Sequence, residues 1–414
     1  MNDGTKALAR LAQLAKLGAY EAGIDRPLAS PQERAARDLF AGWARAAGFG
    51  LRQDSVGNVY VRRDGTQPGL EPILTGSHLD TVKTGGAYDG AYGVVGGICA
   101  LELLEARGVK TKHPIEAVAW VGEEGSRFPL GCLGSSVFAG IKSAEDVLAI
   151  VADDGVSLRD ALASSDGGLL PGVPMRGDRG VAAYLELHVE QGPILEEAGV
   201  SLGVVTAIFG QRRLRATVTG VSGHAGTVPM RLRADALCAA SELVLALDRA
   251  ARTQTDAVAT VGRMLVEPNG TNVVPGSVTF SLDLRAPDDA SLDVIERAFH
   301  DAVADVSARR GVTVEVEAFE RRKPTPMTPA LQAAIHRVAV AMGQKAIDCP
   351  SGAGHDAMSL GTIVPTAMIF VPSIGGRSHV AEERTADADL ELGVEALAAA
   401  LVEVDATLGA KGRG

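Results

Sequence analysis

Five histidines of this 414-residue chain stand in glycine-rich or acidic motifs near the ends of apolar runs, where a metal ion or a substrate could reach them. They are His78, His188, His224, His355 and His379. Loops carried by a rigid scaffold are the usual position of catalytic and binding groups. The remaining three histidines stand before a proline or in stretches with helical spacing, and surface or hydrogen-bonded core positions explain them.

Carboxylates accompany these histidines at short spacing. In GSHLDT, Asp80 follows His78 by two residues, so it forms either an ordinary hydrogen-bonded pair with the imidazole or a contact that fixes its tautomer for metal binding. Asp89, in YDG, either caps the following helix or bridges two cations. Glu123 and Glu124, in GEEGSRF, are either a solvated pair or two groups with different roles, one binding metal and one carrying a proton. A ligand set of imidazoles and carboxylates is the one expected for zinc, manganese or cobalt, and it differs from the thiolate ligands of a sulfur-coordinated site.

The elements that must position these motifs alternate between strand and helix. Apolar or alternating runs at 56–62, 72–78 and 115–128 predict strands, and residues 91–107 predict a helix after Gly90. This order is typical of an α/β sheet, in which sites gather beyond the carboxyl ends of the strands. The motifs fall at these positions.

A second domain interrupts the first. Residues 212–327 predict the order strand, helix, strand, strand, helix, strand, which is that of a ferredoxin-like α+β sandwich. We therefore expect a two-domain α/β protein, in which a catalytic domain of residues 1–211 is completed by residues 328–414.

Composition limits the classes of partner. The formal charge is −11 and there is no basic stripe, so we expect neither a nucleic-acid partner nor an anionic membrane surface. The longest apolar stretches are too short to span a bilayer, and the first residues lack the apolar core of a signal peptide. Four widely spaced cysteines fit reduced thiols. These features predict a cytoplasmic protein with a small-molecule substrate.

Taken together, the motifs resemble the amidase and carbamoylase branch of the M20 metallopeptidase superfamily, which includes N-carbamoyl-L-amino acid hydrolases, allantoate amidohydrolases and β-ureidopropionases. The resemblance covers nearly the whole chain, because nine motifs occur in the order and at the spacing of that branch: GSHLDT, YDG, EEGSRF, LELHVEQGP, GVSGHAGTVPM, GTNVVPG, SLDLRAP, PSGAGHDA and GGRSH.

The resemblance implies two divalent ions, zinc or else manganese or cobalt, held by five side chains: His78, Asp89, Glu124, His188 and His379. His78 and His188 would hold one ion, Glu124 and His379 the other, and Asp89 would bridge them. Glu123 would be the general base and Asp80 would orient His78.

The resemblance also implies a homodimer and a set of substrate-binding residues. His224 would stabilise the oxyanion in the active site of the partner subunit. Arg285 and Asn272 would bind the substrate carboxylate, although a surface charge on a strand is the alternative for Arg285. The pocket would be lined by three further residues, Gln191, Gly354 and His355, the last of which could instead support the site from a turn.

The implied activity is hydrolysis of a ureido group, with a small ureido acid as substrate. An N-carbamoyl-L-amino acid hydrolase, releasing the amino acid, CO₂ and ammonia, is favoured, with an allantoate amidohydrolase or a β-ureidopropionase as alternatives. His188 favours this branch, since true peptidases and aminoacylases of the same fold usually carry a carboxylate there. A peptidase or N-acyl-amino acid deacylase and a catalytically silent homologue are the rival interpretations. Arg377, before the final histidine, departs from the family pattern, and it either puts a second positive group beside the pocket, which would bear on substrate choice, or points to solvent.

Overall fold

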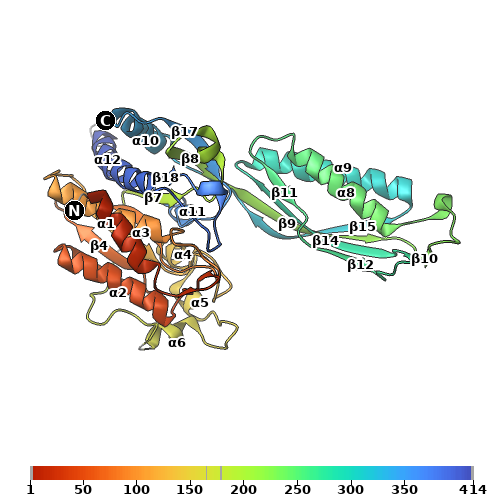
Figure 1. Ribbon diagram of the computed structural model, residues 1–414, viewed down its shortest axis with the longest axis horizontal. Coiled ribbons are helices and arrows are strands. Elements are labelled where there is room, and N and C mark those ends of the chain that lie inside the picture. The colour runs from red at the N-terminus through yellow and green to blue at the C-terminus, as the bar shows by residue number, and fades with distance from the viewer. Residues whose placement is uncertain (1–2, 165, 178–179, 412–414) are drawn as a thin grey trace. The chain divides into compact units, whose positions relative to one another are not determined.

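The computed structural model describes residues 3–164, 166–177 and 180–411 and divides into two compact units (Figure 1). The first unit extends to Thr206 and also contains Met327–Cys349 and the chain from Gly354 onward. The second unit comprises Ala207–Pro326 and Pro350–Ala353. The domain boundaries expected from the sequence, at 211/212 and 327/328, stay a prediction.

A mixed β-sheet lies at the centre of the first unit. Its strands are β3 (Gly50–Gln53), β4 (Val59–Arg63), β5 (Ile73–His78), β6 (Ile115–Trp120), β7 (Ala183–Val189), β8 (Leu202–Ile208) and β18 (Thr366–Val371). Their order is β8-β18-β7-β5-β6-β4-β3, in which β18, β7, β5 and β6 are parallel and β8, β4 and β3 pair antiparallel. The short strands β16 (Thr325–Pro326) and β17 (Ala346–Ser351) pair with β8, and β1 (Ala19–Tyr20) pairs with β2 (Gly23–Ile24).

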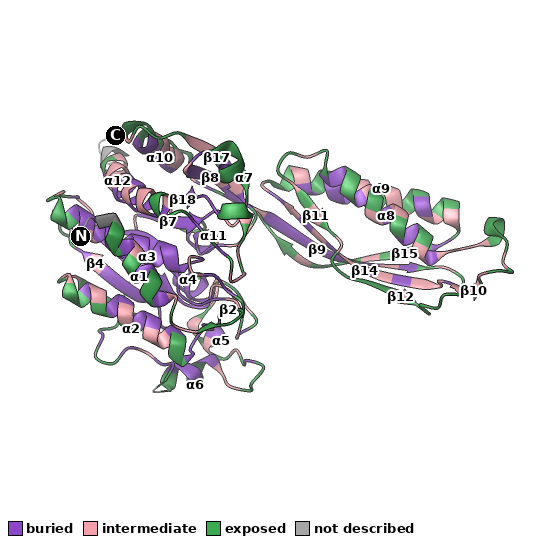
Figure 2. Cartoon of the chain, in the orientation of Figure 1, coloured by how far each residue is buried: buried purple, intermediate pink, exposed green. Residues whose placement is uncertain are grey.

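The parallel strands are the most deeply buried part of this sheet. Every residue of β5, β6, β7 and β18 is buried (Figure 2). Strands covered on both faces are rich in apolar residues, which explains the mostly apolar sequences IEAVAW and TAMIFV, whereas ILTGSH is polar toward its end. The predicted strand at 115–128 ends at Trp120, so both glutamates follow it in a loop.

Helices pack around this sheet. They are α1 (Asp3–Leu14), α2 (Pro31–Ala46), α3 (Ala91–Ala106), α4 (Leu133–Phe138), α5 (Ala144–Leu148), α6 (Leu158–Ala163), α7 (Ile194–Ala198), α10 (Pro329–Ala341), α11 (Ala357–Leu360) and α12 (Asp387–Lys411), with a 3₁₀ turn at Ile374–Gly376. Helix α3 contacts β5, β6 and β7 and also α1 and α12, so every residue from Ala91 to Leu101 is buried. Over the described ranges, no helix combines the length and apolarity needed to cross a membrane.

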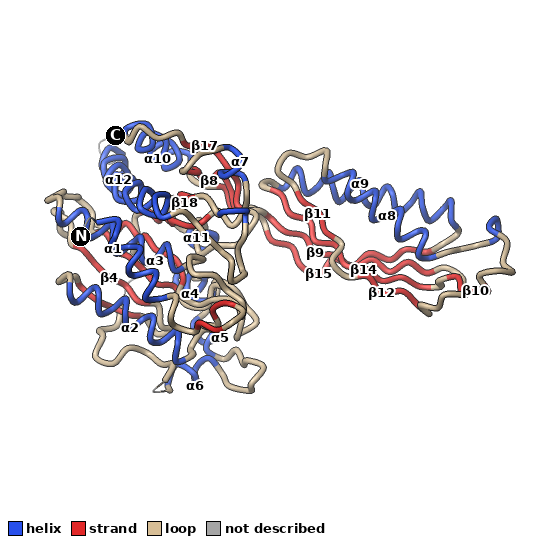
Figure 3. The backbone as a smooth tube through the Cα atoms, viewed as in Figure 1, coloured by secondary structure: helices blue, strands red, loops and turns tan. Residues whose placement is uncertain are grey.

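The second unit is an antiparallel sheet with two long helices on one face (Figure 3). Its elements are β9 (Gly210–Thr219), β10 (Gly223–His224), a 3₁₀ turn (Met230–Leu232), α8 (Ala236–Ala251), β11 (Val258–Thr260), β12 (Met264–Glu267), β13 (Val273–Val274), β14 (Ser277–Ala286), α9 (Asp289–Arg310) and β15 (Thr313–Arg322). The sheet order is β11-β14-β9-β15, with β12 also on β14, and β10 pairs with β13. The predicted run at 257–266 is two strands. The predicted α/β fold class with an inserted α+β domain is confirmed.

Candidate metal centre

Two buried histidines stand at the carboxyl ends of neighbouring parallel strands. His78 is the last residue of β5, and His188 is the penultimate residue of β7. Because the two strands pair in parallel, their ends meet at one edge of the sheet, and the two rings lie with their centroids 6.1 Å apart. The sheet topology therefore brings together histidines that are 110 positions apart in the sequence.

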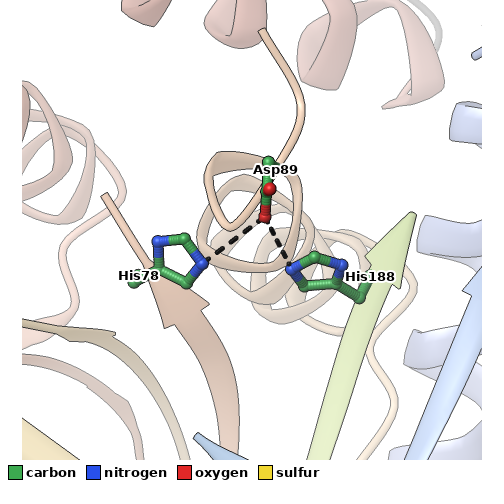
Figure 4. A group of neighbouring side chains, drawn as sticks. All are labelled: His78, Asp89 and His188. Atoms are coloured by element: carbon green, nitrogen blue, oxygen red, sulfur yellow. Dashed lines mark ion pairs between the residues drawn. The ribbon is translucent and has the colours of Figure 1, made fainter. Parts of the chain in front are cut away.

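Asp89 lies between the two rings, in the loop that leads into α3 (Figure 4). Its Oδ1 atom is 3.6 Å from Nε2 of His78 and 3.3 Å from Nε2 of His188. Gly90 makes this approach possible, since a Cβ atom there would stand 2.3 Å from the His78 ring and its φ is +62°. These three side chains have their ligand atoms close enough together to hold one metal ion.

The backbone fixes which nitrogen of each ring faces Asp89. Nδ1 of His78 is 2.9 Å from the carbonyl oxygen of Asp80, and Nδ1 of His188 is 2.8 Å from that of Val189. A carbonyl oxygen only accepts, so each Nδ1 carries a proton and donates it. Both Nε2 atoms are thereby directed at the Asp89 carboxylate, in the tautomer that a metal ion requires.

A second group of ligand atoms shares the same aspartate. Oδ2 of Asp89 is 3.0 Å from Nε2 of His379, which is 3.6 Å from Oε2 of Glu124. The amide of Gln191 donates to the same Oδ2 atom at 2.8 Å, and the hydroxyl oxygen of Ser378 lies 3.2 Å from it. Asp89 thus presents one oxygen to each group of ligand atoms, as a bridging carboxylate does.

The carboxylates of this centre favour positive charge beside them. Burial alone would lower the pKa of His78, but the surrounding carboxylates, Asp89 first among them, raise that pKa well above its usual range. Burial and the neighbouring Asp89 raise the pKa of Glu124 to about 7. The hydrogen bond with Asp89 raises the pKa of His379 to about 9. Closely spaced buried carboxylates and imidazole nitrogens are a donor set that fits divalent ions.

The two adjacent glutamates point to different places. Oε2 of Glu123 is 3.7 Å from Nε2 of His78, whereas Glu124 faces His379. Oε1 of Glu123 accepts a hydrogen bond from the thiol of Cys132 at 3.3 Å. Burial raises the pKa of Glu123 well above its usual value. A carboxylate so placed is suited to hold a proton beside the ligand groups.

Asp80 does not make the contact that we expected from its spacing. Its carboxylate accepts the backbone N–H groups of Glu123 and Glu124, both at 3.2 Å. The orienting contact to His78 comes from the Asp80 backbone carbonyl instead, and the nearest carboxylate oxygen is 3.8 Å from Nδ1. The carboxylate is drawn away because it caps the turn that carries both glutamates, so Asp80 positions those residues as well.

His355 lies beside the first ligand group, and Gly354 precedes it in the chain. The buried His355 ring packs edge-on against His188, with centroids 4.5 Å apart, and burial lowers its pKa well below the usual value. A neutral imidazole here agrees with either a supporting or a substrate-binding role. Ligand atoms of Glu186, His188 and His355 also lie within metal-binding distance of one another, but the Glu186 carboxylate accepts hydrogen bonds from Ser77 and from the Ala357 backbone.

One buried carboxylate of this centre was not predicted. Glu383 is 0% exposed and accepts the backbone N–H groups of Tyr88 and Asp89 at 2.7 and 3.1 Å. The hydroxyl of Ser378 donates to its other oxygen at 2.7 Å. Glu383 therefore joins the loop of the bridging aspartate to the loop of His379. The only signal for it in the sequence is its position in AEE, just after GGRSH.

The three other expected substrate-binding residues lie in the second unit, where His224 and Asn272 are neighbours. His224 is exposed on β10, whose residues pair with β13, and its Nδ1 accepts the backbone N–H of Gly226 at 3.0 Å. The backbone carbonyl of Asn272 accepts the N–H of Ala225 at 2.9 Å. Arg285 is on β14 and lines a cavity of about 580 Å³. Arg377, in the first unit, is exposed.

Comparison with known proteins gives a consistent picture. Residues 74–403 match the sequence model of Peptidase family M20/M25/M40. The chain is 40% identical over 397 residues to an N-carbamoyl-L-amino-acid amidohydrolase of Paenarthrobacter aurescens, an alignment that covers 95% of this chain and 96% of that protein. It is 41% identical over 353 residues to an allantoate amidohydrolase of Bacillus subtilis, covering 84% of this chain and 85% of that protein. The solved structure of an amidase of the hydantoinase/carbamoylase family from Burkholderia multivorans matches it with a TM-score of 0.91 at 40% identity, covering 96% and 97% of the two chains.

Proposed function

Because the chain belongs to peptidase family M20/M25/M40, we propose that this metal-dependent hydrolase cleaves the ureido group of N-carbamoyl-L-amino acids. One water would be consumed, and the amino acid, CO₂ and ammonia would be released. The observation that carries the proposal is the imidazole of His188 in the first ligand group, in a chain whose relatives of similar identity are named amidohydrolases of ureido acids. Allantoate is the second candidate substrate, since an allantoate amidohydrolase is 41% identical to the chain.

We propose that two divalent ions, zinc or else manganese or cobalt, belong to the site. His78, Asp89 and His188 would hold one ion, and Asp89, Glu124 and His379 would hold the other. Bound ions would supply the Lewis acidity that polarises the ureido carbonyl.

The remaining chemistry belongs to this chain's own side chains. Glu123 would accept a proton from the attacking water and pass it to the leaving nitrogen, because its buried carboxylate lies beside the ligand groups and titrates above its usual range. Asp80 would hold the backbone of Glu123 in place. Arg285 and Asn272 would bind the substrate carboxylate. The substrate would also meet three residues of the first unit: Gln191, Gly354 and His355.

A substrate panel tests this function. Protein treated with a chelator and then reloaded with zinc, manganese or cobalt would be assayed against N-carbamoyl-L-amino acids, allantoate, dipeptides and N-acetyl amino acids. We expect turnover of N-carbamoyl-L-amino acids that chelation abolishes and a divalent ion restores, with circular dichroism unchanged. Preferred hydrolysis of allantoate would select the second candidate. Preferred hydrolysis of dipeptides, or full activity without metal, would contradict the proposal.

We further propose a homodimer in which His224 serves the active site of the partner subunit. The resemblance implies this role, and the His224 ring is exposed on the short strand β10 rather than built into the core of its own unit. The hydrogen bond from a donor to the oxyanion is stronger in the transition state than in the substrate complex, so His224→Ala should mainly lower kcat. His224→Ala and Glu123→Gln would each inactivate a different part of the shared site, so mixing subunits of the two variants should restore activity.

The size of the recovery follows from the symmetry of a dimer. In an equal mixture half of the dimers are hybrids, and each hybrid has one complete site, so about a quarter of wild-type activity should return. Mass spectrometry would verify that hybrids form, and each variant alone is the control. Hybrids without recovered activity would mean that His224 does not act across an interface.

A further inference from the structure

The open face of the second unit's sheet carries an anchored arginine. Along β14, residues alternate between half-buried and buried, and Leu282, Leu284 and Ala286 belong to the core beneath α8 and α9. Asp283 and Arg285 therefore lie on the opposite face, away from the helices. Both line the cavity of about 580 Å³ together with Arg213, Phe319 and Gly352.

Asp283 collects hydrogen bonds from three side chains. Its two oxygens accept from Nε and Nη2 of Arg285 at 3.1 and 3.2 Å, a bidentate pair. The amide of Gln211 donates to the same two oxygens at 3.0 and 2.9 Å, and Nε of Arg213 donates at 3.4 Å. Gln211 and Arg213 come from the neighbouring strand β9, directly opposite Arg285 and Asp283. The Asp283 carboxylate is thus itself held from two strands.

The donors of Arg285 can be counted. A guanidinium has five N–H groups, one on Nε and two on each terminal nitrogen. Asp283 takes the one on Nε and one on Nη2, and the carbonyl oxygen of Gly352 accepts from Nη1 at 3.1 Å. One N–H on each terminal nitrogen is left without a partner among the described residues. N–H groups on the two terminal nitrogens of an arginine can bind a carboxylate in bidentate fashion, so these two remain available for a substrate.

We propose that Asp283 is a positioning residue, which fixes the Arg285 guanidinium so that these two N–H groups are presented to the substrate carboxylate. This inference rests on the proposed function, in which Arg285 binds that carboxylate. An arginine without an anchor must lose the freedom of its flexible stem each time substrate binds, whereas an anchored one has already lost it. Asp283 therefore acts on substrate affinity through Arg285 and not on the chemical step.

The negative charge of Asp283 has an opposing effect, because it repels a substrate carboxylate nearby. Two arginines already offset that charge, and the side chains of Asp283 and Arg285 are 28% and 36% exposed. Solvent screening at such exposure weakens a repulsion between charges that are not in contact. When Asp283 is replaced, the loss of the anchor should therefore lower substrate affinity more than the relief of repulsion raises it. Asp283→Glu separates the two effects, because it keeps the charge while displacing the carboxylate.

The test compares KM and kcat for N-carbamoyl-L-alanine and for its α-carboxamide, which lacks the carboxylate. We expect Asp283→Asn and Asp283→Glu each to raise KM for the acid by about tenfold with little change in kcat, and to leave the carboxamide unaffected. Adding either change to Arg285→Ala should have no further effect on KM, because both residues act through one contact. Glu320→Gln is the matched control, since Glu320 pairs with Arg213 and not with Arg285.

The possible failures are distinguishable. If the wild-type protein hydrolyses no ureido acid, the proposed function fails, and this inference fails with it. If the wild type is active but Asp283→Asn leaves KM for the acid unchanged or lowers it, only the positioning role of Asp283 is wrong. The role is also wrong if the two substrates are affected equally, or if the double variant is additive.

Discussion

Replacing Glu123 by Gln should lower kcat by about 10²–10⁴-fold without loss of bound metal. Glutamine has nearly the same shape as glutamate, so it can still accept the thiol hydrogen of Cys132 at its amide oxygen. The amide cannot take a proton from water at neutral pH, and the step that needs a base therefore slows. Glu123 belongs to neither of the two groups formed around Asp89, so the ligand atoms keep their places.

Three measurements would establish this result: kcat for the best ureido substrate, metal content by plasma mass spectrometry, and the temperature of thermal unfolding. Glu382→Gln is the matched control, because it makes the same chemical change at an exposed residue just after the His379 motif. Turnover of Glu123→Gln within about tenfold of the wild type would mean that another group is the base. Loss of metal together with activity would assign Glu123 to the ligands instead.

Much of the architecture was accessible from the sequence because local patterns determine it. Mostly apolar runs such as TAMIFV occur where the parallel strands are covered on both faces, and the polar residues at the end of ILTGSH follow from the direction of a parallel strand. The family assignment made from the motifs is confirmed, as is the α/β fold class with its inserted domain. The prediction of a metal-dependent hydrolase is confirmed as well.

What could not be predicted depends on contacts between distant residues. Glu383 reaches the backbone of Tyr88, 295 positions away, and nothing in the motif AEE distinguishes its buried second glutamate from its exposed first one. The spacing of GSHLDT indicated a contact between the Asp80 carboxylate and His78. It could not show that two N–H groups from the turn after β6 compete for that carboxylate. A short motif specifies which groups lie near a site, but tertiary packing decides which partners those groups bind.

Asp89 should be the least replaceable ligand, because both groups of ligand atoms use it. A substitution of any of the other four expected ligands would weaken only one of the two groups. Asp89, in contrast, contributes Oδ1 to the first group and Oδ2 to the second. Asp89→Asn should therefore deplete both of the proposed ions, and kcat/KM should fall by about 10³-fold or more. The amide replaces one ligand oxygen by an NH₂ group, which repels a cation, and removes the negative charge that the three imidazoles face.

Metal content after extensive dialysis distinguishes a shared ligand from an ordinary one. Asp89→Asn should retain almost no metal, while Glu124→Gln should lose mainly one ion per chain, because Glu124 belongs only to the group with His379. Asp405→Asn is the matched control: this buried aspartate on α12 accepts the backbone N–H groups of Lys112 and His113 and has no part in either group. If Asp89→Asn retained as much metal as Glu124→Gln, the aspartate would serve a single ion. The close approach of its second oxygen to His379 would then be a hydrogen bond that orients the imidazole.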